Sequence, residues 1–403
     1  MAAIVEVEDE VDGRKAADRL ANDWENRDWV PVSPSPVWAR AAVIRFGEIM
    51  AEQPSIFQAS MKRADKGAST LSPRPFQGIL ECLQNADDLG AQQLRVAFRN
   101  RGRPELLIVH DGEPVTFANV GAMMIPWLST KDGDADAAGR FGIGQRTLNA
   151  LGGPIELHAS PFHLVMDTDG PRPCDPESDV PRVYDGSRRD TMLVIPLSPK
   201  VTSEAIAGAV GELSAESLIF LTSIRELTYN DLEDPACNLR FTVEVEHVHQ
   251  GSVDFDGTPT EVAVHDVRVV AGATSGLAPS FRRYSIRRPV PAGEARANKE
   301  TGATTPLGIC APLTGGRPRG LYDRMPLPMP TGLLIGLNAQ FDPDAARSTL
   351  IPNDWNLARM KDLGRLVGWA ALDAFARETA IGWTHVPLAS EAGGEDDWID
   401  AAA

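Results

Sequence analysis

Few features of this sequence point to a secreted, membrane-spanning or nucleic-acid-coating protein. Its 403 residues include only four cysteines, with no C-x-x-C pair and no Cys/His pair at metal-ligand spacing. They are Cys82, Cys174, Cys237 and Cys310. No apolar run is long enough to span a bilayer, and the acidic start MAAIVEVEDEVDGRK does not resemble a signal peptide. We therefore expect reduced thiols, no membrane partner and a cytoplasmic location.

Positive charge is also scarce. The chain has 39 Lys and Arg against 56 Asp and Glu, a formal net charge of -17. Non-specific attraction to nucleic-acid phosphates or anionic lipid is therefore not expected to be its main activity. Hydrophobic residues make up 43% of the chain and charged residues 24%, which is typical of a globular protein and excludes wholesale disorder.

The domain organisation follows from length and from helix-breaking residues. Pro31, Pro34 and Pro36 separate residues 1–36, an expected N-terminal extension, from the helical spacing that begins at Val37. We expect an α+β chain with a first domain over 37–230, a second over 231–385 and a disordered acidic tail over 386–403.

The segment FQGILECLQNADDLGAQ has the strongest helical pattern of the chain. Its apolar positions are Ile79, Leu83 and Ala86. Glu81, Asn85 and Asp88 have the same spacing on another face, so one helix is predicted to have an apolar face and an oxygen-rich face. Gly90 is suited to cap the end of that helix.

A hairpin is predicted directly after this helix. QLRVAFRN alternates apolar and polar residues like a half-buried strand, and ELLIVHD reads as an antiparallel partner that ends at Asp111. Further strands are predicted in IELHAS, HLVMDTD and TMLVIPL, and His110, His158 and His163 are interpreted as strand histidines without ligand spacing.

The remaining pattern is more varied. We expect a long loop over 129–144, a short helix over 145–151, an amphipathic helix over 203–220 and a strand over 224–229. In the second domain, strands are expected in FTVEVEHV and VAVHDVRVV, followed by a loop-rich basic stretch over 281–324, the apolar GLLIGLNAQF and a helix over 356–378.

Three short motifs occur in order along the first domain. They are E-x-x-x-N at Glu81 and Asn85, D-G-x-P starting at Asp111, and G-x-x-G-x-G starting at Gly139. Together with LQNADD, HDGEPVTF, LSTK and GRFGIG, they resemble the GHKL superfamily of ATPases, in its sacsin-type branch near the ninety-kilodalton heat-shock chaperones. The resemblance covers about 75–229 and implies a Bergerat-type α/β sandwich, a mixed sheet covered by helices, followed by an α/β middle (transducer-like) domain.

The polar residues of the helix that contains Glu81 and Asn85 suit phosphate chemistry even apart from the family resemblance. Mg²⁺ prefers oxygen ligands and keeps several waters, so the amide oxygen of Asn85 with phosphate oxygens would hold it. One turn earlier, Glu81 would orient or deprotonate a water aimed at the terminal phosphate. Asp88 shares this face and is expected to line the site, whereas Asp87 is ambiguous. The alternative is an ordinary exposed polar helix face.

Two further residues are candidates for base recognition. The carboxylate of Asp111 would accept a hydrogen bond from the exocyclic amine of adenine, which gives ATP over GTP; the alternative is a plain β-turn. Many GHKL members have D-x-G-x-G here, and D-G-E-P departs from that pattern. Thr191 resembles the threonine that binds adenine through water in chaperone relatives, with a simple strand threonine as the alternative.

The glycine motif and two basic residues complete the candidate set. Gly139, Gly142, Ile143 and Gly144 would form a phosphate cradle and lid hinge, with the N-terminus of the following helix directed at the phosphates. Lys131 would reach the phosphates as a point charge, unless it is only solvated. The resemblance further implies that Arg347 of the second domain is an arginine finger, typically worth ~10³ in rate, with a structural arginine as the alternative.

These residues predict an ATP- and Mg²⁺-binding protein that hydrolyses ATP slowly and acts as a chaperone-like conformational switch. The expected partners are ATP and an unidentified protein client, with the chain a monomer or a transient homodimer. One alternative is a nucleotide sensor without turnover. Another is a DNA-remodelling ATPase of the topoisomerase or mismatch-repair type, which the charge disfavours; its only support is the basic segment containing Arg282, Arg283, Arg287 and Arg288.

Overall fold

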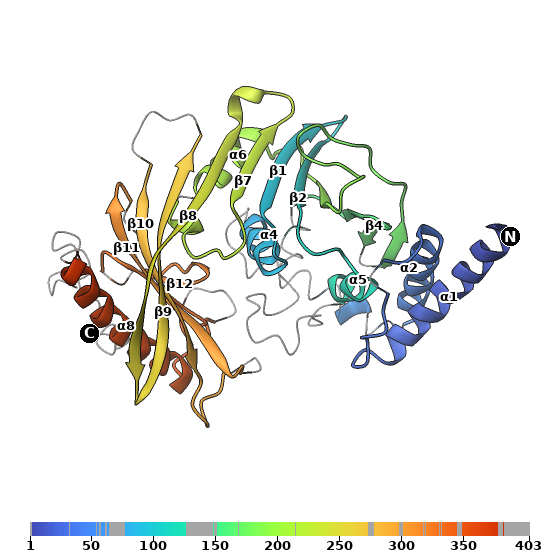
Figure 1. The fold of residues 1–403 in the computed structure, drawn as a ribbon. Helices are drawn as coiled ribbons and strands as arrows, with labels where there is room; N and C mark the ends of the chain where they lie inside the picture. Colours follow the sequence, from blue (N-terminus) through green and yellow to red (C-terminus); the bar gives the residue numbers. More distant parts are fainter. Residues whose placement is uncertain are drawn as a thin grey trace. The chain divides into compact units, whose positions relative to one another are not determined.

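The structure is a computed structural model (Figure 1). It describes residues 2–31, 33–53, 55, 58–60, 63, 77–125, 148, 151–167, 169–213, 215–272, 278–297, 301–316, 318, 320–329, 331, 333–344, 349–377 and 382. These form two compact units. The first holds the described residues up to 210, together with 227–239, and the second holds 211–226 and those from 240 onward. Helices and antiparallel strands occur in both, which confirms the α+β class.

Two helices open the first unit. Helix α1 (Ala2–Asn22) packs along α2 (Pro36–Ala51), whose first turn is capped by the Ser35 side chain. A Cβ on Gly13 would lie 2.3 Å from the Trp38 carbonyl oxygen, so the helices approach closely only because this residue is glycine. Arg45 pairs with Asp18 at 2.9 Å. Much of the expected extension is thus a helix packed on its neighbour, which the acidic sequence of α1 did not indicate.

The predicted helix and hairpin are present. Helix α4 (Gln77–Asp88) is followed by the antiparallel pair β1 (Gln93–Asn100) and β2 (Pro104–His110), with Leu94 opposite His110. Gly90 has φ +70° and Gly102 has φ +86°, as expected for a helix cap and a hairpin turn. Figure 1 shows α4 beside β1 and β2.

Within this unit the strand order is β7-β1-β2-β6-β3-β4-β5. Beyond β2 come β6 (Thr191–Pro196), β3 (Ile155–Ala159), β4 (Phe162–Asp167) and β5 (Gly170–Pro173), and β7 (Glu226–Asp231) lies beside β1 on the other side. Helices α2 and α5 (Phe117–Met124) cover one face, where the Phe117 ring stacks on that of Phe162, with centroids 6.3 Å apart. Val180, Val183 and Tyr184 cover the opposite face and pack with buried residues of β1, β2 and β6.

Strand β1 is buried on both faces, so the expectation of a half-buried strand was wrong. Its polar positions include Arg95 and Arg99, both buried. Arg95 donates two hydrogen bonds to the Asp190 carboxylate, each 3.0 Å long. Arg99 pairs with Glu105 and, at 2.7 Å, with Glu177. The arginines occupy the alternate positions of a strand but meet carboxylates from other segments instead of water.

The single helix expected over 203–220 is two helices, α6 (Ser203–Gly211) and α7 (Ala215–Leu218). Gly211 is the last residue of α6, and glycine is unfavourable inside a helix. The predicted strand in this region is confirmed, shifted slightly, as β7. None of the helices in the described residues is long and apolar enough to cross a membrane.

The second unit has the strand order β13-β12-β14-β11-β10-β9-β8. A long hairpin joins β8 (Leu239–Phe255) to β9 (Thr258–Ala271) through Asp256 and Gly257, which both have positive φ. The remaining strands are β10 (Ser280–Pro289), β11 (Thr304–Thr314), β12 (Gly320–Asp323), β13 (Met325–Pro326) and β14 (Gly336–Ala339). Strands β12 and β14 are parallel.

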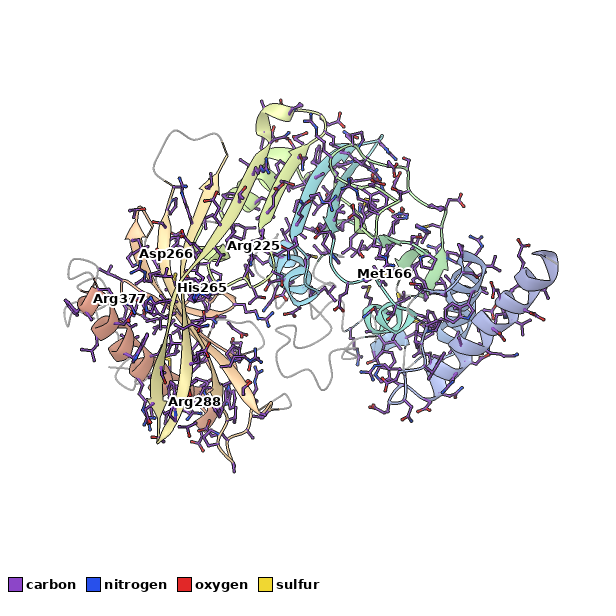
Figure 2. All side chains as sticks on the ribbon, in the orientation of Figure 1. Met166, Arg225, His265, Asp266, Arg288 and Arg377 are labelled. Atoms are coloured by element: carbon purple, nitrogen blue, oxygen red, sulfur yellow. The ribbon has the colours of Figure 1, made fainter. Side chains whose placement is uncertain are left out.

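The basic stretch over 281–324 was predicted to be rich in loops, and this was wrong, because it contains β10, β11 and β12. Four of its arginines, Arg282, Arg283, Arg288 and Arg296, have partners inside the unit. Arg282 binds Asp266 at 2.8 Å, and buried Arg288 binds Asp362 at 2.9 Å. Figure 2 labels Asp266 and Arg288 in this unit. Acidic partners from distant segments let charged residues occupy strand positions.

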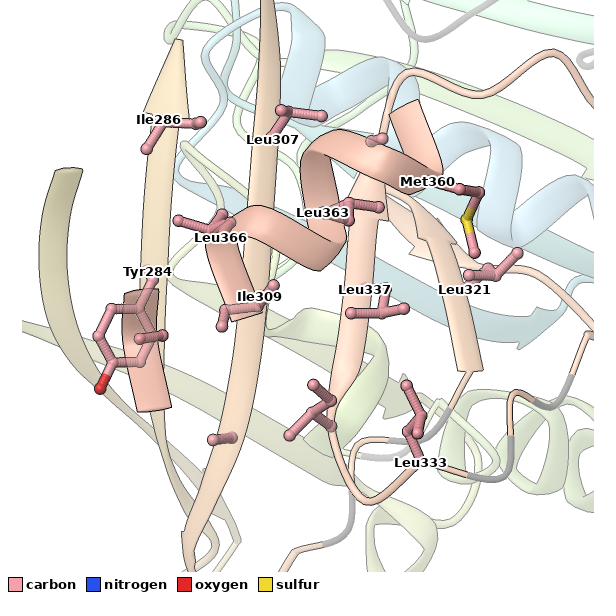
Figure 3. Packing of buried hydrophobic residues seen from close by; sticks show 14 of the residues in the cluster. Tyr284, Ile286, Leu307, Ile309, Leu321, Leu333, Leu337, Met360, Leu363 and Leu366 are labelled. Carbon is pink, nitrogen blue, oxygen red and sulfur yellow. The ribbon is translucent and has the colours of Figure 1, made fainter. Parts of the chain in front are cut away.

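The predicted C-terminal helix is confirmed as α8 (Asp354–Arg377). It packs across β11 and β14, and Figure 3 shows Met360, Leu363 and Leu366 against Leu307, Ile309 and Leu337. All six side chains are buried. This apolar contact gives the unit one continuous core, because it buries the helix face and the sheet face together.

Replacement of Arg95 by alanine is predicted to destabilise the first unit strongly. The change leaves the Asp190 carboxylate buried without its partner, which typically costs about 3–5 kcal/mol in the free energy of unfolding. Arg172→Ala removes an ion pair whose arginine side chain is 67% exposed, and should cost about 0–1 kcal/mol. Urea unfolding followed by circular dichroism measures both; equal losses would contradict this account.

The free energy of unfolding should also fall in acid, because the Glu177 carboxylate becomes protonated and loses its ion pairs. Burial raises the pKa of this carboxyl, but hydrogen bonds from Arg99 and Arg101 outweigh burial and lower the pKa to about 2. Because the folded-state pKa is depressed, the stabilisation is full above the ordinary carboxyl pKa near ~4.3 and is lost as pH falls towards 2. In Glu177→Gln, the free energy of unfolding should fall less between pH 5 and pH 2 than in wild type, by on the order of 1–2 kcal/mol, as measured by urea unfolding at each pH. An unchanged slope would show that Glu177 does not carry the effect.

Candidate functional site

Helix α4 presents Glu81, Asn85 and Asp88 along one partly exposed stripe. Ile79 and Leu83 are buried on the apolar face of the same helix, as their spacing predicts. Asp87, which the sequence left ambiguous, is buried. The oxygen-rich stripe is thus held on a helix anchored by its opposite face.

Asp111 follows directly after β2, and its two carboxylate oxygens have different surroundings. Its Oδ1 accepts hydrogen bonds from the backbone N–H groups of Gln92 and Gln93, at 2.8 and 2.9 Å. Oδ2 makes no hydrogen bond within the described residues, and the side chain is exposed. One oxygen therefore anchors the start of β1, and the other remains directed at solvent or at a ligand.

The turn after Asp111 lies against the end of α4. The Glu113 N–H donates to the Leu89 carbonyl at 2.9 Å. A Cβ on Gly112 would lie 2.9 Å from that same carbonyl oxygen, so the close approach requires glycine here. The Gly112 N–H donates to Nδ1 of His110 at 3.2 Å. These contacts place the Asp111 turn beside the C-terminal end of the oxygen-rich helix.

Thr191 is the first residue of β6 and lies directly opposite His110 of β2. Because side chains alternate along a strand, Thr191 shares its face with Leu193, whose partner Leu157 belongs to the helix-covered side. Thr191 is 2% exposed, and its Oγ1 has no hydrogen-bond partner in the part of the chain that the structure describes. A buried hydroxyl without a partner is costly, typically about 1–3 kcal/mol.

The site residues follow a linear order. A helix rises 1.5 Å per residue, so Asn85 lies about 6 Å and Glu81 about 12 Å along the axis from Leu89, where the Asp111 turn packs. This span is comparable to an extended nucleoside triphosphate. A base at Asp111 and Thr191 would thus place its phosphates towards Asn85 and its terminal phosphate towards Glu81.

Several predicted site residues lie outside the described residues. They are Lys131, Gly139, Gly142, Ile143, Gly144 and Arg347. Their roles as phosphate cradle, point charge and arginine finger stay predictions. The candidate residues that the structure describes are those of α4, the turn at Asp111 and the start of β6.

The sequence reading missed a second cluster of ligand-type side chains. His110, His158 and His163 do lie on strands, as interpreted. Glu156, His158 and Cys174, however, place one ligand atom each within 4.8 Å of one another. The Glu-x-His spacing on a strand was visible, but the cysteine comes from beyond another strand, so linear spacing did not reveal the group.

Comparisons with known proteins add little. No protein-family model matches the chain, and no curated protein matches it. Among solved structures, a topoisomerase IV ATP-binding domain of Francisella tularensis, in complex with a small-molecule inhibitor, is similar with 13% identity and a TM-score of 0.28. The alignment covers 48% of this chain and 58% of that one. A TM-score this low does not establish a shared fold, so the GHKL and sacsin-type resemblance stays a prediction from the motifs.

Proposed function

We propose that the chain binds ATP with Mg²⁺ along α4, hydrolyses it slowly and works as a conformational switch. The observation that carries this proposal is the buried, unpartnered hydroxyl of Thr191, which lies opposite His110, the residue directly before Asp111. Folded proteins rarely keep such a group without a ligand or ordered water. Its position opposite the strand end that leads into Asp111 suits a polar heterocycle bound by both residues.

Base selection would come from Asp111 and Thr191. Oδ2 of Asp111 would accept a hydrogen bond from the exocyclic amine of adenine. Guanine presents a carbonyl oxygen at that position, which would face another acceptor and lose the contact. The Thr191 hydroxyl would bind the ring directly or through water. Because Oδ1 is held by two backbone N–H groups, the carboxylate is oriented before the base arrives.

Phosphate chemistry would depend on the stripe of α4. The oxygen donors of Asn85 and Asp88 fit Mg²⁺, which takes few protein ligands and keeps waters and phosphate oxygens. The ion, when bound, would neutralise charge on the phosphates. Glu81 would orient and deprotonate the attacking water, and Lys131 and the glycines from Gly139 to Gly144 would hold the phosphate oxygens.

The wider role rests on the motif resemblance. A lid over the nucleotide would close, Arg347 would contribute charge to the transition state, and the chain would act on a protein client in a chaperone-like manner. Fold-level analogy does not identify that client.

Two alternatives remain distinct. A nucleotide sensor would bind ATP by the same residues without needing Glu81. The DNA-remodelling alternative loses support, because three of its four arginines, Arg282, Arg283 and Arg288, donate to carboxylates or carbonyl oxygens inside the second unit. Those charges are engaged, and they do not form an open phosphate-binding patch.

Asp111→Asn is predicted to weaken ATP binding at least about tenfold. The asparagine keeps an oxygen for Gln92 and Gln93 but turns an NH₂ group towards the adenine amine, so two donors meet. Asp185→Asn is the matched control, since that exposed carboxylate also accepts a backbone N–H, from Ser187 at 2.9 Å. Isothermal titration calorimetry with ATP and GTP measures the effect; unchanged ATP affinity in Asp111→Asn would contradict base recognition by this residue.

Thr191→Val tests the hydroxyl without changing the side-chain shape. The ligand-free variant should be as stable as wild type or about 1 kcal/mol more stable, because no hydrogen bond is lost. ATP affinity should fall roughly three- to tenfold, and Thr191→Ser should retain it. Strong destabilisation with unchanged ATP affinity would mean that the hydroxyl serves the fold alone.

Glu81→Gln is predicted to lower Mg²⁺-dependent ATP turnover about 100-fold or more while leaving ATP affinity within a factor of about three. Glu204→Gln, an exposed change on α6, is the control and should not alter turnover. Arg347→Ala should also lower turnover with binding retained. Phosphate release under steady-state conditions is the measurement. Wild-type binding without turnover above the Glu81→Gln level would favour the sensor.

A further inference from the structure

The face of the first unit opposite α5 has a second cluster of polar side chains. Glu156 and His158 are two residues apart on β3, so both point to the same side of the sheet. Cys174 follows directly after β5 and leads into the segment 174–190 that covers this face. The carboxylate, imidazole and thiol each contribute one atom to a group within 4.8 Å.

His158 is the least explained member of this cluster. Its side chain is buried, with 1% exposure, and Nε2 has no hydrogen-bond partner within the described residues. The same nitrogen lies 3.5 Å from Oε2 of Glu156. Two ligands bound about 2.0–2.2 Å from one ion at a tetrahedral angle lie about 3.4 Å apart. The spacing therefore suits two ligands of a shared cation better than a direct hydrogen bond.

The other ring nitrogen of His158 is held in place. Nδ1 lies 3.3 Å from Nδ1 of His163, which is the cross-strand partner of His158 on β4. If His158 donates its Nδ1 proton to His163, Nε2 keeps its lone pair for a ligand. Metal-binding histidines generally use the second ring nitrogen in this way. The backbone N–H of Cys174 also donates to the His163 carbonyl at 3.0 Å, so strand pairing positions all three donors.

We propose that Glu156, His158 and Cys174 form a zinc site that ties the covering segment to β3. One thiolate, one imidazole and one carboxylate suit Zn²⁺, whereas Mg²⁺ and Ca²⁺ prefer oxygen ligands throughout. The two anionic ligands balance the charge of the divalent ion. Three protein ligands leave a fourth position for water or another donor.

This site is separate from the proposed nucleotide site and does not depend on it. His158 lies opposite Met192 on β6, and Met192 is the neighbour of Thr191. Successive residues of a strand face opposite sides, so the zinc ligands lie behind the sheet when it is viewed from the helices. Failure of one proposal therefore leaves the other intact.

The test uses the full chain, freed of metal and kept reduced, and titrates it with Co²⁺ and then Zn²⁺. Wild type should bind one ion, with a thiolate-to-cobalt charge-transfer absorption that Zn²⁺ displaces. Cys174→Ser should lose that absorption, and His163→Gln should weaken affinity roughly 10–100-fold by freeing the His158 ring. Cys237→Ser is the matched control, because Cys237 lies beside Asp234, makes no histidine contact within the described residues and should keep full binding.

A thermal melt of each metal-free variant is the control for correct folding. Each variant should unfold at the same temperature as metal-free wild type. Saturating Zn²⁺ should then raise the melting temperature of wild type and Cys237→Ser, but not of Cys174→Ser. Three results would each overturn the proposal: no Co²⁺ absorption in wild type at micromolar metal, binding unchanged in a folded Cys174→Ser, or equal loss in Cys237→Ser.

Discussion

The buried ion pair between Arg95 and Asp190 fixes the place where β6 enters the sheet of the first unit. Asp190 directly precedes Thr191, and Arg95 holds both of its oxygens from the middle of β1 while also donating to the Val183 carbonyl at 2.9 Å. Two charges removed from water stay together because each would be costly alone. The pair therefore anchors the covering segment and sets the register in which Thr191 meets His110 and Met192 meets His158.

Because of that register, one strand serves two chemically different faces. On the helix-covered face, β6 contributes the buried Thr191 hydroxyl, opposite the residue that precedes Asp111, and this is the part of the proposed nucleotide site that β6 supplies. On the other face, its neighbour Met192 lies opposite His158, whose imidazole belongs to the proposed zinc site. A shift of β6 by one residue would turn Thr191 and Met192 to the opposite faces of the sheet, so both the proposed nucleotide site and the surroundings of His158 would be lost.

Local patterns predicted the elements whose signals lie within a few residues. The apolar spacing of Ile79, Leu83 and Ala86, the glycine after α4 and the short turn before β2 were sufficient for the helix and hairpin. Prediction failed where the partner is distant in the chain. Arg95 and Arg99 look solvent-facing until Asp190 and Glu177 are brought to them, and the arginines of β10 resembled a basic loop for the same reason. The cluster of Glu156, His158 and Cys174 forms only through the pairing of neighbouring strands, so the spacing of these residues in the sequence did not predict it.

Within the described residues, the candidate nucleotide site consists of residues from α4, the turn at Asp111 and the start of β6. Asp111 also has a structural role there. Its Oδ1 is needed to hold the start of β1, so the residue is restrained by folding even before any ligand is considered. Gly112 is restrained in the same way by the Leu89 carbonyl. The decision between a nucleotide site and a simple turn therefore rests with Oδ2 of Asp111, which makes no hydrogen bond within the described residues, and with the unpartnered hydroxyl of Thr191.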